Sequence, residues 1–300
     1  MADSPTMTDK LNTREDSDGG GRPDNDGKSD GGGRPGVSAY PLPHASHDLS
    51  GQVAIVTGAT SGLGRRFARV LAASGAHVAL AGRRVERLRD VKTEIEAKGG
   101  VAVAVPTDMT VTDDILGLVE ATRAELGTPT ILINNAGMAD AKFATNISVD
   151  LIDKVLGLNL RGPFILAREV AKGLIAEGRE GRIVNISSIM ATHYGGEGAA
   201  LYSVTKAAIT RMSEALAVEW AKFGINVNAI APGYVRSEMT DAMALRLGGG
   251  EVPADLSVHY PRGRLPTPEM LDSTLLFLCS PASGAVTGTV VKVDDGQTPR

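Results

Sequence analysis

The sequence predicts an α/β protein in which a doubly wound parallel sheet of seven strands is flanked by helices on both faces. Short runs rich in β-branched residues alternate with longer amphipathic stretches, and no hairpin turn joins adjacent runs. Gly58, Asn135, Ser188 and Pro232 each come directly after, or within a residue or two of, such a run. Because parallel sheets bind ligands at the carboxyl ends of their strands, these positions predict a binding site.

The predicted strands cover residues 53–57, 77–81, 101–105, 130–134, 182–187, 225–230 and 289–293. Helical patterns separate them, including an amphipathic stretch that ends at Ala73 and another over residues 201–223. The chain has 300 residues, of which 42% are hydrophobic, and this is ample for a buried core. We therefore expect one catalytic or binding domain over residues 49–300.

The first strand leads into a glycine-rich turn, Gly58-Ala59-Thr60-Ser61-Gly62-Leu63-Gly64, and then into a helix. Glycine lets the backbone turn tightly and approach a ligand, and a helix start offers unpaired N–H groups to a phosphate. Strand, glycine turn and helix in this order are typical of a Rossmann-type domain that binds a dinucleotide. The spacing is G-x-x-x-G-x-G, and a turn that binds nothing is the alternative.

A second motif combines hydroxyl, phenol and ammonium groups. Ser187 ends the fifth predicted strand and Ser188 follows it, and Tyr202 and Lys206 lie four residues apart in the stretch 201–223. In a helix, this spacing puts the phenol and the ammonium group on the same face. A cation beside a phenol favours phenolate, so the pair suggests proton transfer in carbonyl chemistry, although a short Tyr-x-x-x-Lys match is also common on inert surfaces.

Together these motifs resemble the short-chain dehydrogenases/reductases, and the resemblance covers residues 49–298. Thr57 to Gly64 is similar to the family's cofactor turn, and Asn134-Asn135-Ala136-Gly137 to its sequence after the fourth strand. By the same resemblance, the catalytic residues are Asn159, Ser188, Tyr202 and Lys206. The gap between serine and tyrosine is one residue longer than the family's commonest spacing, so Ser187 stays an alternative to Ser188.

The resemblance implies reversible hydride transfer between a nicotinamide and a ketone or secondary alcohol. Tyr202 would exchange a proton with the substrate oxygen, Ser188 would hydrogen-bond the same oxygen, and Lys206 would lower the pKa of the phenol. Asn159 would hold a water that links Lys206 to solvent. Similarity to 3-oxoacyl-carrier-protein reductases suggests a ketoreductase. Oxidation of a sugar acid, polyol or other secondary alcohol is the alternative, and a non-catalytic cofactor-binding scaffold a remote one.

The end of the second predicted strand bears on the choice of cofactor. NAD-binding relatives usually place an acid there, but this chain has Gly82, followed by Arg83 and Arg84. Because a guanidinium group can bind a 2′-phosphate, we predict NADP(H), with Arg83 as the main discriminator and Arg84 as a helper. NAD(H) stays possible, since the arginines could merely solvate a helix start.

Further cofactor contacts are implied by position. Asp108 resembles the residue that contacts adenine, although it could instead cap the helix that starts near Val111. Ser237 occupies the place of a threonine that holds the nicotinamide carboxamide. The full predicted cofactor set is Gly58, Thr60, Ser61, Gly62, Leu63, Gly64, Arg83, Arg84, Asp108, Met109, Asn135, Ala136, Gly137, Tyr202, Lys206, Pro232, Gly233, Val235 and Ser237.

Residues 1–48 differ from the rest, being poor in large apolar residues and rich in Asp, Gly, Ser and Pro; the sequence Ser-Asp-Gly-Gly-Gly-Arg-Pro occurs there twice. This composition predicts a disordered tail. Through Ser50 there are 5 basic and 9 acidic residues, which leaves 26 of each from the total of 31 and 35, so the net charge of −4 lies in the tail. A near-neutral domain gives no reason to expect a nucleic acid or an anionic membrane as partner.

Other features narrow the function further. The chain shows no apolar run long enough to cross a bilayer and no basic start typical of a secretory signal, so we expect a cytoplasmic protein. Scattered histidines and a lone Cys279 in an apolar run predict a buried thiol and no metal site. The resemblance also implies that the irregular region 234–267 forms a substrate lid, and that the late helices and last strand form a homodimer or homotetramer interface.

Overall fold

The computed structural model describes residues 44–140, 142–196, 198–235, 238 and 261–298. They form one compact unit that begins at His44. Residues 1–43 of the predicted tail lie outside the described residues, as does most of the predicted lid. Residues 44–48 are exposed, and the carbonyl of Ser46 accepts a hydrogen bond from Ser280 Oγ at 2.7 Å.

A sheet of seven parallel strands forms the centre of this unit, in the order β3-β2-β1-β4-β5-β6-β7. The strands are β1 (Val53–Thr57), β2 (His77–Gly82), β3 (Ala102–Pro106), β4 (Ile131–Asn134), β5 (Gly181–Ile186), β6 (Ile225–Pro232) and β7 (Val290–Val293). Each lies within two residues of its predicted limits, and the predicted fold class is confirmed. The strand order reverses between β1 and β4, which is where such sheets open a crevice for a ligand.

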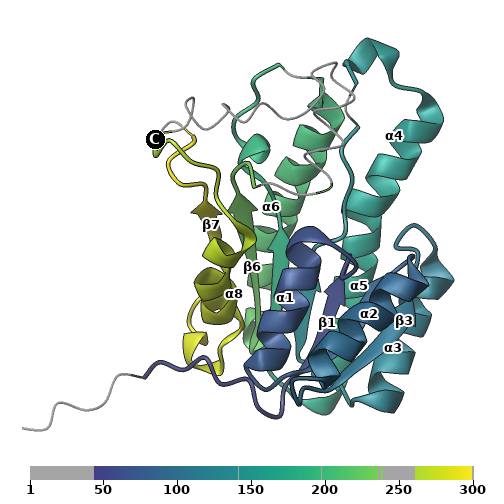
Figure 1. Cartoon of the computed structure of the whole chain (residues 1–300), viewed down its shortest axis with the longest axis vertical. Helices are drawn as coiled ribbons and strands as arrows, with labels where there is room; N and C mark the ends of the chain where they lie inside the picture. Colours follow the sequence, from purple (N-terminus) through teal and green to yellow (C-terminus); the bar gives the residue numbers. More distant parts are fainter. Residues whose placement is uncertain (1–43, 141, 197, 236–237, 239–260, 299–300) are drawn as a thin grey trace, which may run out of the picture. The chain divides into compact units, whose positions relative to one another are not determined.

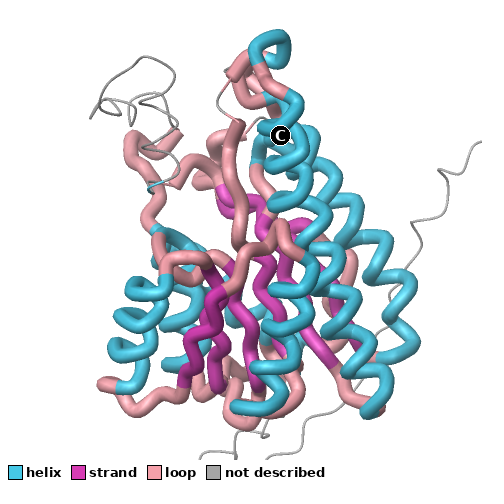
Figure 2. Tube along the Cα trace, turned by 90° about the vertical axis from the view of Figure 1, so that its right-hand side faces the viewer, coloured by secondary structure: helices cyan, strands magenta, loops and turns pink. Residues whose placement is uncertain are grey.

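Helices cover both faces of the sheet, as Figure 2 shows. The α-helices are α1 (Gly62–Ala73), α2 (Val85–Glu96), α3 (Thr112–Glu125), α4 (Val149–Leu156), α5 (Gly162–Glu177), α6 (Ala200–Trp220) and α8 (Asp272–Cys279). A π-helical turn, η2 (Gly157–Arg161), joins α4 to α5. Short 3₁₀ turns are η1 (Ala144–Asn146), η3 (Ile189–Ala191), η4 (Ala221–Phe223), η6 (Pro268–Leu271) and η7 (Pro281–Ser283). Figure 1 labels the main elements.

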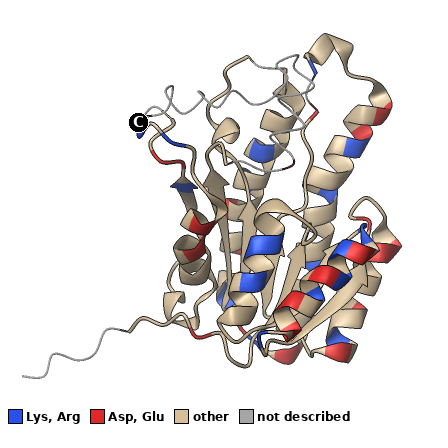
Figure 3. Cartoon of the chain, in the orientation of Figure 1, with Lys and Arg blue, Asp and Glu red and all other residues tan. Residues whose placement is uncertain are grey.

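The alternation of side chains along β1 divides the core into two layers. Ala54 and Val56 belong to the cluster that includes residues of α1, α2 and α8, whereas Ile55 belongs to the cluster with α3, α5 and α6. Because successive strand residues point to opposite faces, both layers need apolar side chains from β1, and all of its residues except Thr57 are apolar. Charged residues lie mostly in the helices (Figure 3).

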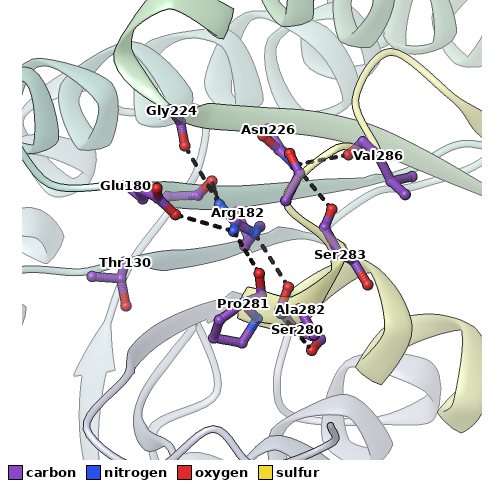
Figure 4. A network of polar contacts seen from close by, with 12 residues as sticks. Thr130, Glu180, Arg182, Gly224, Asn226, Ser280, Pro281, Ala282, Ser283 and Val286 are labelled. Carbon is purple, nitrogen blue, oxygen red and sulfur yellow. Dashed lines mark hydrogen bonds and ion pairs between the residues drawn. The ribbon is translucent and has the colours of Figure 1, made fainter. Parts of the chain in front are cut away.

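A buried arginine fastens the end of the sheet where β5 and β6 begin (Figure 4). Arg182 has 5% of its surface exposed, and its guanidinium group donates to the carbonyls of Gly181, Gly224, Ser280 and Pro281 at 2.9–3.4 Å. It also contacts the exposed Glu180 at 3.3 Å. Arg182 thus ties the turn after α8 to the two strands by donating to backbone carbonyls of both.

Candidate active site

A cavity of about 380 Å³ opens at the carboxyl ends of β1 to β6. Most residues that the sequence nominated line its wall, and these are Gly58, Thr60, Ser61, Gly62, Leu63, Arg83, Arg84, Asp108, Met109, Asn135, Ala136, Gly137, Ser188, Tyr202, Lys206, Pro232, Gly233 and Val235. Gly64 and Asn159 are buried and do not line the wall. Ser237 lies outside the described residues.

The glycine turn after β1 is shaped by close backbone contacts. Gly58 has φ +67°, and a Cβ atom there would lie 2.8 Å from Asn135 Nδ2. A Cβ atom on Gly64 would lie 2.2 Å from the carbonyl oxygen of Gly58, which no real side chain allows. Ser61 precedes α1 and makes no side-chain cap, so the N–H groups at the helix start are not capped by its hydroxyl. This cradle of glycines before an uncapped helix suits the pyrophosphate of a dinucleotide.

Asn135 connects the end of β4 to the end of β1, where the glycine turn begins, through hydrogen bonds. Its Nδ2 donates to the carbonyl of Thr57 at 2.9 Å, and Thr57 Oγ1 accepts from the backbone of Asn135 and Ala136 at 3.0 Å each. The ends of β1 and β4 are therefore fixed to each other across the point where the strand order reverses. A ligand bound along the turn would lie against Ala136 and Gly137, which also line the cavity.

Tyr202 and Lys206 enter the other half of the cavity from the first turns of α6. The ammonium group of Lys206 lies 5.5 Å from the centre of the Tyr202 ring and donates to the carbonyl of Ile186 at 2.6 Å. Ser188 follows β5 and accepts a hydrogen bond from Met190 N at 3.1 Å. Ser188 and Tyr202 line the same cavity, and the Ser188 hydroxyl acts on the phenol by lowering its pKa, so both hydroxyl groups can meet one oxygen atom of a ligand.

Burial dominates the ionisation of this pair. Desolvation raises the pKa of Tyr202 to about 12, while the hydrogen bond from Ser188 acts in the opposite direction. Desolvation also lowers the pKa of Lys206 to about 8. The expected lowering of the phenol pKa by Lys206 is therefore not seen in the protein by itself. At neutral pH the phenol is protonated, which is the state that a proton donor needs.

The two serines differ in their surroundings. Ser187 Oγ donates to the carbonyl of Lys206 at 3.0 Å and is hydrogen-bonded to Thr210 Oγ1 at 2.8 Å, and Ser187 has 2% of its surface exposed. Its hydroxyl is thus used to hold β5 against α6. Ser188 instead reaches Tyr202, and this contrast favours Ser188 for contact with a substrate.

Asn159 lies in the π-helical turn η2 and has 1% of its surface exposed. Its amide accepts from Met138 N at 2.9 Å and donates to Met138 O at 2.8 Å and to Thr205 Oγ1 at 3.1 Å. Gly137 lies between this amide and Lys206, since a Cβ atom there would be 3.4 Å from Asn159 Oδ1 and 3.7 Å from Lys206 Nζ. The π turn thus brings the Asn159 amide close to Lys206, on the other side of Gly137. Such turns are frequent at functional sites.

The two arginines after β2 have different partners. Arg84 donates from Nε and Nη2 to Thr60 Oγ1 at 3.0 and 2.6 Å, and from Nη2 to Ser61 Oγ at 2.7 Å. The side chain of Arg83 is 62% exposed, and its Nη1 lies 3.8 Å from Asp108 Oδ2. Asp108 does not cap α3, whose N-cap is Val111; it accepts from the backbone and hydroxyl of Thr110 instead.

Sequence reasoning missed several residues of this region. Thr107, Leu158, Ile186 and Glu238 line the cavity, and the buried Asp140 contacts the start of α6. Thr107 and Ile186 could have been nominated, because they too come at the ends of predicted strands. Asp140 and Glu238 had no local signal, since only their distant partners give them a role.

Among the residues that the structure describes, no group of three or more His, Cys, Asp or Glu side chains could hold a metal ion. Cys279 is buried, as predicted, and burial raises the pKa of its thiol to about 12.

The helices in the described part of the chain include none that is both long and apolar enough to cross a membrane.

Comparisons with known proteins agree with this geometry. The family model for short chain dehydrogenases matches residues 52–246. The chain is 34% identical to the 3-oxoacyl-[acyl-carrier-protein] reductase of Rickettsia bellii (83% of this chain, 98% of the relative) and 37% identical to the gluconate 5-dehydrogenase of Gluconobacter oxydans (83% and 96%). It also superposes on a crystal structure of a gluconate 5-dehydrogenase from Burkholderia cenocepacia in complex with NADP and tartrate, with a TM-score of 0.77, 29% identity and coverage of 84% and 96%.

Proposed function

The chain belongs to the short-chain dehydrogenase/reductase family, and from this premise we propose that it is an NADP(H)-dependent ketoreductase of the 3-oxoacyl-reductase type. One observation carries the proposal: Tyr202, Ser188 and Lys206 line the same cavity as the glycine turn. A dinucleotide held along that turn would extend toward the phenol. When bound, the nicotinamide would supply the hydride for the reduction of a ketone.

The residues of this chain would supply the proton to the substrate and stabilise the negative charge that develops on its carbonyl oxygen. Tyr202, protonated at neutral pH, donates its proton to the carbonyl oxygen of the substrate. Ser188 donates a hydrogen bond to the same oxygen and stabilises the negative charge that develops there. Lys206, next to the phenol, helps to stabilise it after the proton has left. Asn159, whose amide lies near Lys206 on the other side of Gly137, holds a water that links Lys206 to solvent. The proton that Tyr202 gives up is replaced along this path.

NADP(H) is supported by the absence of an acid at Gly82 and by the exposed guanidinium group of Arg83 at the cavity wall. Arg83 would bind the 2′-phosphate as a charge-assisted fork. Measuring kcat/KM with NADPH and NADH for the wild type and for Arg83→Asp tests this assignment. A wild-type preference for NADH would refute it.

A second candidate is the oxidation of a sugar acid or polyol, because a gluconate 5-dehydrogenase is as similar to the chain as the reductase is. The same side chains serve both directions, since Tyr202 can also accept a proton from a hydroxyl group. A panel of ketones, including an acetoacetyl thioester, and of alcohols, including gluconate, would distinguish the candidates when tested with both nicotinamides. Turnover of none of these compounds, or turnover that survives Tyr202→Phe, would contradict the mechanism.

We also propose that the protein assembles as a homodimer or homotetramer. Phe164 on α5 is 46% exposed, and Val204 and Val218 on α6 are 61% and 80% exposed, so both helices present apolar side chains to solvent in the single chain. Sedimentation of the purified protein tests the assembly, and a monomer at micromolar concentration would refute it.

A further inference from the structure

A carboxylate group from another part of the chain meets the arginines at the part of the cavity that follows β2. Glu238, which comes after β6, lines the cavity together with Arg83 and Arg84. Its Oε2 lies 2.9 Å from Arg84 Nη1, and its Oε1 lies 2.5 Å from Arg87 Nη1. Arg84 immediately precedes α2 and Arg87 lies in its first turn, so one acid holds two guanidinium groups at the start of this helix.

Arg84 uses four of its five N–H donors within the protein. Its Nε and Nη2 bind the hydroxyl groups of Thr60 and Ser61 in the glycine turn, and its Nη1 binds Glu238. A phosphate that used Arg84 would have to replace a carboxylate that is already in place. The hydrogen bonds from Arg84 and Arg87 also hold the pKa of Glu238 below its usual range, so the acid is ionised at neutral pH.

The position of this charge has a direct consequence for the ligand. In dinucleotide-binding domains an acid at the end of the second strand disfavours a 2′-phosphate, and this chain has Gly82 there. Glu238 brings an acid to the same arginines from a different element. A phosphate dianion near Arg83 and Arg84 would be repelled by the carboxylate, whereas a ribose hydroxyl group carries no charge to be repelled.

We propose that Glu238 is a specificity-determining residue, which weakens the binding of NADP(H) relative to NAD(H) by occupying Arg84 and Arg87. The inference rests on the proposed dinucleotide site but not on the identity of the substrate. It means that the chain carries opposing determinants: Arg83 favours the 2′-phosphate and Glu238 opposes it. The balance between the two cofactors is then set by the segment after β6 as well as by the end of β2.

The test is direct titration of the full-length protein with NADPH and with NADH, followed by ligand fluorescence, for the wild type, Glu238→Gln and Glu238→Ala. Removal of the charge is expected to tighten NADPH binding by about five- to tenfold, the scale of one lost like charge at short range in a partly exposed site. The Kd for NADH should change by less than about twofold, and the gain for NADPH should shrink as salt is added.

Glu94 offers a matched control. It also bridges two arginines, Arg65 and Arg69, but it lies on α2 outside the cavity. Glu94→Gln should leave the ratio of the two Kd values unchanged. If Glu238→Gln and Glu238→Ala also leave the ratio unchanged, or if they weaken NADPH binding, Glu238 is only a structural tie and the inference is wrong. If the wild type binds neither dinucleotide, the proposed function itself fails, which is a different result.

Discussion

The carboxylate group of Asp140 accepts a hydrogen bond from the backbone N–H of Tyr202 at 3.2 Å, and its second oxygen accepts from Leu201 N at 3.3 Å. Asp140 has 1% of its surface exposed. The residue that precedes α6, Ala199, has no side chain with which to cap the helix. The segment after β4 therefore supplies the cap for the helix that carries Tyr202 and Lys206, and a negative charge at a helix start is favourable.

We predict that Asp140→Ala lowers kcat by about tenfold or more, because the first turn of α6 frays and Tyr202 loses its fixed position. The free energy of unfolding should fall by about 1–2 kcal/mol, as for the loss of other helix caps. Asp140→Asn, which keeps one acceptor oxygen, should retain more kcat than the alanine variant. The measurements are steady-state kinetics on a confirmed substrate and urea unfolding.

Ser148→Ala is the control for Asp140, since Ser148 caps α4 by accepting from Leu151 N. It should reduce stability without a comparable change in kcat. Equal effects of the two variants on kcat would mean that Asp140 is an ordinary cap with no particular influence on Tyr202.

The neighbouring serines make a second, paired prediction. Ser188→Ala should lower kcat by about 100-fold, the usual loss when a donor to a developing oxyanion is removed. Ser187→Ala should keep most of kcat but lower the free energy of unfolding by about 1 kcal/mol, because its hydroxyl is hydrogen-bonded to the backbone carbonyl of Lys206 and to the hydroxyl group of Thr210. The opposite pattern of kcat values would assign the catalytic role to Ser187.

The shifted pKa values predict how stability depends on pH. Burial lowers the pKa of Lys206 from 10.5 to about 8, so between these values the unfolded chain binds a proton that the folded protein has released. Stability must then rise with pH from about 8. Burial raises the pKa of Cys279 from 9.0 to about 12 and that of Tyr202 from 10.0 to about 12, which makes stability fall with pH above these ordinary values.

Between pH 8 and 9, Lys206 therefore dominates the change in stability, because Cys279 and Tyr202 oppose it mainly above their ordinary pKa values of 9.0 and 10.0. We expect the free energy of unfolding to rise by about 1 kcal/mol across this pH window. Urea unfolding at several pH values in this window measures the rise, and Lys206→Met should abolish it. A rise of the same size in Lys206→Met would show that other groups cause it.

Much of this architecture follows from local sequence. Each strand was predicted to within two residues because each contains a short run rich in β-branched and other apolar residues. The glycine turn and Tyr202 with Lys206 were found because their function requires fixed spacing. The π-helical turn around Asn159 was not predicted, since its residues fit an ordinary helix equally well. Asp140 and Glu238 were missed because each acts on residues at least 60 positions away, which only the fold brings near. The pKa of Tyr202 depends on burial, which the Tyr-Lys spacing does not reveal.

A last prediction concerns Arg182, at the opposite end of β5 from the active site. Arg182→Met should lower the free energy of unfolding by about 2 kcal/mol, because the buried carbonyl of Ser280 would lose its guanidinium donor and the partly buried carbonyl of Pro281 would lose one too. The kcat/KM of the folded variant should stay within about threefold of wild type, since the cavity lies at the other ends of the strands.

Arg211→Met is the control for Arg182, because Arg211 is 78% exposed and pairs only with Glu214 on the surface of α6 among its described contacts. Its effect on the free energy of unfolding should stay within about 0.5 kcal/mol. Urea unfolding of the three proteins under the same conditions gives the comparison. A loss below about 1 kcal/mol for Arg182→Met would mean that water replaces the guanidinium group at these carbonyls, and that Arg182 does not fasten this end of the sheet.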